Sequence, residues 1–319
     1  MFLGILSLVT CYIPILVSIA FFTLFERKGL GYFQNRKGPN KVGYFGIIQP
    51  FADAMKLFCK EQIKLISFNI VPYFFAPVFS LMLALCLWSL YYSSYAVWFS
   101  LFGVLFFLSV SAINVYSTLM AGWASNSKYA LLGAFRAIAQ TISYEVSLAL
   151  ILLSCVCLSS SFNLCVVLEY SSVVWSCFLL FPVCFMWFVS ILAETNRAPF
   201  DFAEGESELV SGFNIEYGSG GFALIFMAEY ANILFMSMMS SLLFFGGKMI
   251  WLVTGVIAFC FVWVRASFPR FRYDLLMQLT WTCFLPMSLF ILSFVLSLKF
   301  FLLLQMTSKL DSWLPMSMF

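Results

Sequence analysis

Long apolar segments separated by shorter polar ones dominate the pattern along the chain. A helix needs about 20 mainly apolar residues to cross the hydrocarbon core of a bilayer. We therefore expect an all-α membrane protein that forms a single polytopic domain over residues 1–319. The pattern predicts eight transmembrane helices, at about residues 3–25, 69–91, 98–121, 134–158, 172–193, 220–245, 249–268 and 283–304.

Proline lies inside or beside several of these predicted spans. Membrane helices tolerate proline where neighbouring helices satisfy the freed backbone groups. The first apolar segment lacks both a basic leading region and a small-residue cleavage site, so we expect a retained span and not a signal peptide. The prolines concerned are Pro14, Pro72, Pro77, Pro182 and Pro286.

The polar segment after the first span contains one predicted amphipathic helix, over residues 47–60. Pro50 suits its first turn. One interpretation is a helix that lies on the bilayer surface, and another is a helix that packs against the spans and helps to wall a cavity. At helical spacing, one face carries the polar Gln49, Asp53, Lys56 and Lys60, and the other the apolar Ile47, Ile48, Phe51, Met55 and Phe58.

Composition agrees with a membrane protein and excludes several kinds of chemistry. The chain is 63% hydrophobic and 10% charged, whereas soluble domains carry about 25% charged residues. Histidine, the commonest metal ligand and general base, is absent. The ten cysteines are scattered and form no C-x-x-C pair. We therefore expect no redox cofactor or metal bound by this chain alone.

Basic residues are distributed unequally between the two sides of the predicted bundle. In membrane proteins, the loops on the inner side of the membrane carry most of the Lys and Arg residues. This rule places both termini on the outer side, where only Lys248, Lys299 and Lys309 would lie. The inner loops would hold Arg27, Lys28, Arg36, Lys37, Lys41, Lys56, Lys60, Lys64, Lys128, Arg136, Arg197, Arg265, Arg270 and Arg272.

Three glutamates lie within predicted spans or at a span end. Glu145 and Glu229 fall near mid-membrane, and Glu194 falls at the inner end of the fifth span. A charged carboxylate at that depth costs on the order of 3 kcal/mol or more, and such residues usually mark ion or proton pathways. The alternative is a protonated glutamate that hydrogen-bonds to a neighbouring helix.

The segment 194–217 concentrates negative charge between two spans. It holds five glutamates and one aspartate against a single arginine, Arg197. Its interleaved Phe200, Phe202 and Phe213 favour carboxylates gathered around a buried, hydrated site, although a solvated loop is the alternative. The acidic residues are Glu194, Asp201, Glu204, Glu206, Glu208 and Glu216.

The last inner loop carries Arg265, Arg270 and Arg272. These arginines either only follow the positive-inside rule or pair with the acidic segment, since arginine suits bidentate carboxylate pairing.

Taken together, the polar motifs resemble one family. They are Glu26-Arg27-Lys28, Arg36-Lys37-Gly38-Pro39-Asn40-Lys41, 49–57, Gly122-Trp123-Ala124-Ser125-Asn126-Ser127, 136–145, 193–217, Phe226-Met227-Ala228-Glu229-Tyr230 and Pro269-Arg270-Phe271-Arg272-Tyr273-Asp274. From about residue 15 to 285 the chain resembles the chain 1 family of NADH–ubiquinone oxidoreductase, the mitochondrially encoded membrane subunits of respiratory complex I.

The resemblance implies a protein of the mitochondrial inner membrane that joins the membrane arm of complex I to its hydrophilic arm. It implies that the chain forms much of the tunnel by which ubiquinone enters, while partner subunits hold the quinone head group. NADH, FMN and the iron–sulfur clusters would likewise belong to partner subunits. Partners would be the quinone-site hydrophilic subunits, neighbouring membrane-arm subunits and lipids, with no nucleic acid.

The resemblance also implies roles for individual residues. The quinone tunnel would include Arg27, Arg36, Asp53, Phe226 and Arg272. The proton path would include Glu145, Glu194, Asp201, Glu204, Glu206, Glu208, Glu216 and Glu229. Coupled titration of neighbouring carboxylates would transmit the effect of quinone reduction.

Two other classes of function remain open at this point. An ion–proton antiporter or a hydrogenase membrane anchor is one, although the only lysine considered for an antiporter site, Lys299, lies near the end of the last span. A structural anchor that only docks the hydrophilic arm is the other.

Overall fold

The described part of the chain is a bundle of helices without any β-strand. A computed structural model describes residues 2–62, 67–91, 101–202, 205, 212–214, 216–246 and 249–313, with side chains described between residues 9 and 305 of these ranges. The main helices are α1 (Phe2–Phe33), α2 (Gln49–Cys59), α3 (Ile70–Trp88), α4 (Gly103–Ala124), α5 (Lys128–Ser159), α6 (Leu164–Val173), α7 (Ser176–Leu179), α8 (Phe181–Glu194), α10 (Ser219–Ser240), α11 (Ile250–Ser267), α12 (Tyr273–Gln278) and α13 (Leu285–Trp313).

Seven helices of the described residues are long and apolar enough to cross a membrane. They coincide with seven of the eight predicted spans, which confirms the predicted fold class. The observed bounds are Val9–Phe33, Ile70–Trp88, Gly103–Ala124, Lys128–Ser159, Ser219–Phe245, Ile250–Ser267 and Tyr273–Gln305.

The fifth predicted span, over 172–193, is interrupted and not continuous. Its range holds the end of α6, the single turn α7 and then α8. Leu180 leaves helical geometry with φ −121° and ψ 48°, and Pro182 lies in the first turn of the next helix, as suits a residue without a backbone N–H. The 14 residues of α8 extend about 21 Å, less than the roughly 30 Å of a bilayer core.

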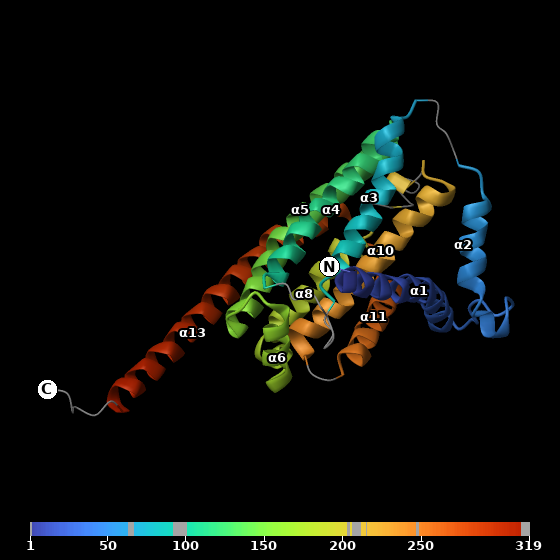
Figure 1. Cartoon of the computed structure of the whole chain (residues 1–319). Helices are drawn as coiled ribbons and strands as arrows, with labels where there is room; N and C mark the ends of the chain where they lie inside the picture. The colour runs from blue at the N-terminus through green and yellow to red at the C-terminus, as the bar shows by residue number, and fades with distance from the viewer. Residues whose placement is uncertain are drawn as a thin grey trace.

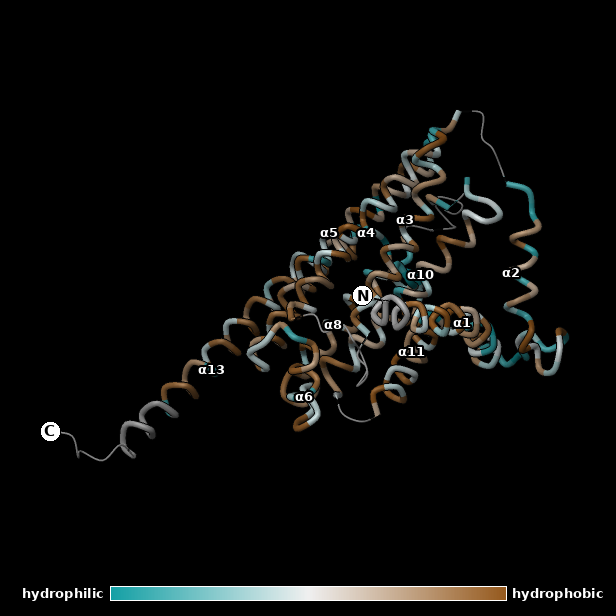
Figure 2. Tube along the Cα trace, viewed as in Figure 1, coloured by the Kyte–Doolittle hydropathy of each residue, from teal (hydrophilic) through white to brown (hydrophobic). Residues whose placement is uncertain are grey.

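The core of the bundle lies around α5 and α10. Within their most apolar windows, 56% and 61% of residues are buried inside the protein, against 11% for the last helix. Tyr144 on α5 and Phe235 on α10 are among the largest fully buried side chains. Figure 1 shows α13 leaving this core as a long helix toward the C-terminus, and Figure 2 shows that most of its described residues are hydrophobic.

Lys299 on α13 binds the end of α5. Its Nζ donates a 2.6 Å hydrogen bond to the carbonyl oxygen of Cys157, and it also contacts the hydroxyl of Ser160. The last carbonyls of a helix lack helical partners and carry partial negative charge, which a lysine satisfies. Lys299 is therefore a helix-end contact, which leaves it no position opposite a mid-span glutamate.

The amphipathic helix α2 stands beside the bundle, next to α1 and α10 (Figure 1). It begins at Gln49 with Pro50 in its first turn, as predicted. Phe51 of α2 meets Phe21 of α1 edge to face, with ring centroids 6.1 Å apart. α2 therefore closes one side of the space in front of α10.

Candidate functional site

An apolar cavity with a volume of about 300 Å³ lies between α1, α2 and α10. Among the described residues, Arg27 and Asp53 are the charged members of its lining. The cavity thus offers a mainly hydrophobic space with one ion pair at its wall, which suits an apolar molecule with a polar end. Its lining comprises Leu16, Ile19, Ala20, Thr23, Arg27, Pro50, Asp53, Ala54, Leu57, Phe58, Phe222, Ala223, Phe226, Met227 and Tyr230.

The ion pair at this wall joins α1 to α2. Arg27 Nη1 donates to Asp53 Oδ2, and Gln49 Nε2, one turn earlier on α2, donates to Asp53 Oδ1 at 2.9 Å. The side chains are 52% and 34% exposed, and such pairs contribute only about 0–1 kcal/mol to stability. The pair is better placed to orient a ligand than to hold the fold. Three predicted quinone-tunnel residues, Arg27, Asp53 and Phe226, meet here.

The structure supports the interpretation of the amphipathic helix as a cavity wall, and the bilayer-surface interpretation stays a prediction. Pro50, Ala54 and Leu57 line the cavity, so α2 does wall one. The predicted apolar face is divided, because Phe58 also lines the cavity whereas Phe51 and Met55 are largely exposed on the protein surface. That exposed face is the one that would meet lipid or a partner. Sequence periodicity identified the apolar stripe but not which face met the cavity.

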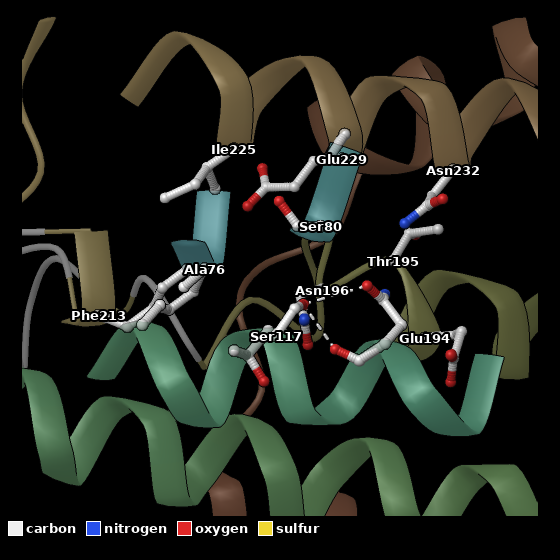
Figure 3. A pocket seen from close by; sticks show the side chains of 14 residues that line it. Ala76, Ser80, Ser117, Glu194, Thr195, Asn196, Phe213, Ile225, Glu229 and Asn232 are labelled. Atoms are coloured by element: carbon white, nitrogen blue, oxygen red, sulfur yellow. Dashed lines mark hydrogen bonds between the residues drawn. The ribbon is translucent and has the colours of Figure 1, made fainter. Parts of the chain in front are cut away.

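A second, polar cavity lies between α3, α4, α10 and the beginning of the acidic segment (Figure 3). Its cavity volume is about 50 Å³, enough for a few water molecules. Glu229 projects into it from α10, and Glu194 borders it at the end of α8. The lining comprises Ala76, Ser80, Asn114, Ser117, Thr118, Ala121, Glu194, Thr195, Asn196, Phe213, Ile225, Ala228, Glu229 and Asn232.

Several buried polar atoms of this cavity lack a hydrogen-bond partner among the described residues. They are Glu194 Oε2, Asn196 Oδ1 and Asn232 Oδ1. Buried polar groups of native proteins nearly always have partners, commonly ordered water. A polar cavity with such atoms is therefore suited to hold water, which supports a hydrated site over a dry glutamate contact.

Glu145 lies in the middle of α5 and is half-buried. It is not among the residues that line the polar cavity, but its carboxylate is near enough to repel a negative charge on Glu194. Neighbouring carboxylates of this kind do not ionise independently. Of the three predicted membrane glutamates, Glu194 and Glu229 thus border one cavity. Glu145 does not line this cavity but interacts electrostatically with Glu194.

A buried charged group, which the sequence did not single out as a site, joins four segments. Glu26 on α1 is only 6% exposed. Its Oε1 accepts from Arg265 Nη1 on α11 and, at 3.4 Å, from Arg197 Nη1 in the segment after α8. Its Oε2 accepts a 2.5 Å hydrogen bond from the hydroxyl of Tyr230 on α10. We call Glu26, Arg197, Tyr230 and Arg265 the Glu26 group.

Arg197 is the member of this group that lies outside the membrane helices. Its guanidinium lies over the ring of Tyr230, with Cζ 4.4 Å from the ring centroid. Burial alone would lower the pKa of Arg197, but the negative charge of Glu26, with smaller contributions from Tyr230 and Glu229, raises the pKa instead. Arg197 therefore stays charged although it is buried.

Glu26 could have been found from its position alone. It follows an apolar run of 25 residues and begins the polar motif at the end of the first predicted span. A charged residue is expected at a span boundary, so Glu26 was not singled out. The observed α1 continues to Phe33, so Glu26 lies within the helix. An acidic residue inside a membrane helix is a functional-site hypothesis by default.

The other predicted site residues lie apart from the two cavities or outside the described residues. Arg36 is exposed in the loop after α1, and Arg272 is exposed beside Asp274, with Nε 3.4 Å from its carboxylate. The backbone oxygen of Glu216 accepts a hydrogen bond from Tyr73. Glu204, Glu206 and Glu208 lie outside the described residues.

The arginines of the last inner loop have different partners. Pairing with the acidic segment therefore describes some of them and not others. Arg270 Nη2 lies 3.2 Å from Asp201 Oδ2, so one arginine does pair with the acidic segment. Arg265 instead binds Glu26, and Arg272 pairs within its own loop. Stacked rings of Phe200 and Phe271, 5.7 Å apart, reinforce the contact between the two segments.

Fold and cavities together define a class: a polytopic helical membrane protein with an apolar cavity next to a cavity that contains buried carboxylates. Among the described residues no cluster of His, Cys, Asp or Glu could hold a metal ion. A family model described as NADH dehydrogenase matches residues 6–296. The chain belongs to this NADH dehydrogenase family.

Relatives from distant animals agree in name. The chain is 55% identical to NADH-ubiquinone oxidoreductase chain 1 of Aedes aegypti, over 94% of this chain and 96% of the relative. The protein of the same name from Heterololigo bleekeri is 55% identical, over 92% and 97% of the two chains. That of Branchiostoma lanceolatum is 51% identical, over 94% and 98%.

Proposed function

We propose that this chain is the membrane subunit of the proton-pumping NADH–ubiquinone oxidoreductase that forms part of the quinone tunnel and the first part of the proton path. As a subunit it takes part in NADH:ubiquinone reductase activity and has no separate catalytic activity. Family membership and the names of the relatives support the enzyme assignment. Partner subunits bind NADH, FMN and the iron–sulfur clusters.

One observation carries the tunnel assignment. Arg27, Asp53 and Phe226, which are far apart in the sequence, line one apolar cavity. An isoprenoid tail needs an apolar wall, and a quinone ring needs hydrogen-bond donors at one place. The cavity provides both, because its wall is mainly apolar and Arg27 is the cationic residue among its described lining.

The polar cavity supports the proton-path assignment. Glu194 and Glu229 border one space with unpartnered polar atoms, and Glu145 interacts with Glu194. Such an array can pass a proton by way of water, and a charge change at one carboxylate shifts the others. In this proposal the basic loops face the matrix of the mitochondrion, and both termini lie on the intermembrane-space side of the inner membrane.

A pair of alanines on α2 provides the test of the tunnel. Ala54 lines the apolar cavity, whereas Ala52 is exposed on the same helix and does not line it. We expect Ala54→Trp in the assembled complex to raise the KM for a long-chain ubiquinone about tenfold, or about 1.4 kcal/mol. Ala52→Trp should leave it unchanged. NADH oxidation by ferricyanide should be normal in both variants. Equal KM values for Ala54→Trp and wild type would contradict the proposal.

A further inference from the structure

Two cysteine thiols lie side by side at the break between α7 and α8, away from both cavities described above. Cys177 belongs to the single turn α7, and Cys184 belongs to α8. Their Sγ atoms are 3.6 Å apart, within hydrogen-bonding distance for thiols. Both residues are half-buried, and both thiols are free. The fold therefore holds a reduced thiol pair at this place.

The interruption of the helix brings these two thiols together. In a continuous α-helix, residues seven positions apart are separated by about 10.5 Å along the axis, whereas a disulfide needs Cα atoms within about 7 Å. Leu180, with φ −121° and ψ 48°, ends α7 and redirects the chain before α8. Cys155 and Cys157, by contrast, lie on the unbroken α5, where residues two positions apart point about 160° away from each other. Spacing along the sequence would have selected the wrong pair.

A third cavity gives an apolar route to one of the two sulfurs. It has a volume of about 300 Å³ and lies between α8, α11, the end of α10 and the turn that follows α10, Ser241–Phe245. Cys184 lines it, and so does Cys260 of α11. Its described lining contains no charged residue. A space of this kind admits a small apolar molecule more readily than an ion.

We propose that Cys177 and Cys184 form a redox-active thiol pair, which an organic hydroperoxide oxidises to a disulfide across the α7–α8 break. Cys184, which the reagent reaches first, attacks the O–O bond, and this step gives a sulfenic acid and releases an alcohol. The Cys177 thiol then displaces water from that sulfenic acid and forms the S–S bond. The two sulfurs lose two electrons, and the hydroperoxide gains them as it becomes alcohol and water.

Closure of the disulfide needs only a short movement. The sulfurs must come about 1.5 Å closer to reach the S–S length of about 2.05 Å. A torsional change at Leu180, which is already non-helical, moves α7 toward α8. α7 carries Phe178, whose ring stacks on Trp175. Trp175 in turn meets Phe245 after α10, with ring centroids 6.0 Å apart. Oxidation would therefore fix the segment that packs on the end of α10.

Simple packing is the competing explanation for the contact. A free cysteine often acts as a small apolar side chain, and two such side chains can touch without sharing any chemistry. Thiols that only pack would oxidise independently, and Cys184 would proceed to sulfinic acid. In a reactive pair the second thiol captures the sulfenic acid, so oxidation stops at the disulfide. The product therefore distinguishes the two explanations.

Peptide mapping of the assembled complex in its membranes tests the pair. The membranes are treated with cumene hydroperoxide, dissolved in detergent with N-ethylmaleimide, and digested with chymotrypsin. Cleavage after Phe178 separates the two cysteines, so a disulfide appears as two linked peptides. We expect the linked peptides to increase roughly tenfold over untreated membranes and to separate on addition of dithiothreitol. Cys260 has no hydrogen bond to another cysteine among the described residues, and it should stay alkylated.

Two serine variants provide the matched comparison. In Cys184→Ser, Cys177 should stay alkylated after the same treatment, because it has lost its partner. Cys260→Ser changes the same cavity and should give linked peptides at the wild-type yield. In wild-type membranes, no increase in linked peptides would overturn the proposal, and so would Cys184 oxidised to sulfinic acid without a link to Cys177. This wild-type result decides the matter even where a variant fails to assemble, and it does not depend on the quinone tunnel.

Discussion

Tyr73 on α3 and Tyr217 at the end of the acidic segment stack face to face, with ring centroids 4.5 Å apart and an angle of 5° between the rings. Each hydroxyl also binds the backbone of the other's segment. Tyr73 donates a 2.7 Å hydrogen bond to Glu216 O, and Tyr217 donates one of 3.3 Å to Tyr73 O. This reciprocal contact fixes the end of the acidic segment to the helix that also borders the polar cavity.

Substitution of Tyr217 should loosen the acidic segment in proportion to what is removed. Tyr217→Phe keeps the stacked ring and loses the hydroxyl contacts, at a cost of about 1 kcal/mol. Tyr217→Ala also loses the ring and should cost about 3 kcal/mol or more. Limited proteolysis of residues 194–217 in the intact complex measures the difference. Equal cleavage rates in Tyr217→Ala and wild type would show that the stack does not hold the segment.

The contribution of Tyr217 should not vary with pH in the physiological range. Burial, with a smaller effect of Tyr73, raises the pKa of Tyr217. A raised folded-state pKa gives stability that is complete below the unfolded value, about 10, and is lost as pH rises toward the folded value. The difference in thermal stability between Tyr217→Phe and wild type should thus be constant from about pH 6 to 9 and shrink above about pH 10.

Neutral replacements of the membrane glutamates test the proton path. Glu145→Gln or Glu229→Gln should lower quinone-driven proton translocation about tenfold, because glutamine cannot take up and release a proton. Glu169→Gln on α6, outside both cavities, is the matched control. The measurement is proton translocation together with quinone reduction in assembled complex. If both activities stay at wild-type levels, the glutamates only join helices.

Asp53→Asn distinguishes a tunnel wall from a docking anchor. The exposed ion pair with Arg27 contributes only about 0–1 kcal/mol to stability, so we expect the complex to assemble normally. The apparent KM for ubiquinone should rise, because the neutral amide no longer orients the Arg27 guanidinium. Native gel electrophoresis and quinone kinetics together give the answer. Lost assembly with unchanged kinetics in the residual complex would favour an anchor.

A glycine contact positions the turn that follows the acidic residues. A Cβ on Gly133 of α5 would lie 2.9 Å from the Cα of Gly212. Gly133→Ala should therefore cost about 1–3 kcal/mol, as overpacking does. Gly255→Ala on α11 is the control, since no heavy atom lies within 4 Å of its added Cβ. Thermal unfolding of the complex measures both, and equal effects would contradict close packing at Gly133.

The sequence predicted helices better than it predicted their interruptions. Seven spans were found from apolar length, since the bilayer requires a helix with a long continuous apolar sequence. The break before Phe181 was not predicted, although Pro182 was noted. Proline at the first turn of a helix and proline inside a membrane helix look alike in sequence, because only the neighbouring contacts decide between them.

The sequence by itself determined the membrane class, the amphipathic helix and the identity of the unusual carboxylates, since burial of charge in an apolar segment is costly and visible in composition. It also indicated that Arg27, Asp53 and Phe226 belong together, through resemblance to a family. Only the tertiary structure decided which acids share a cavity and that Glu26 binds Arg197, Arg265 and Tyr230, 171 to 239 residues away. Such partners depend on how helices cross in space, and no local spacing along the chain records that.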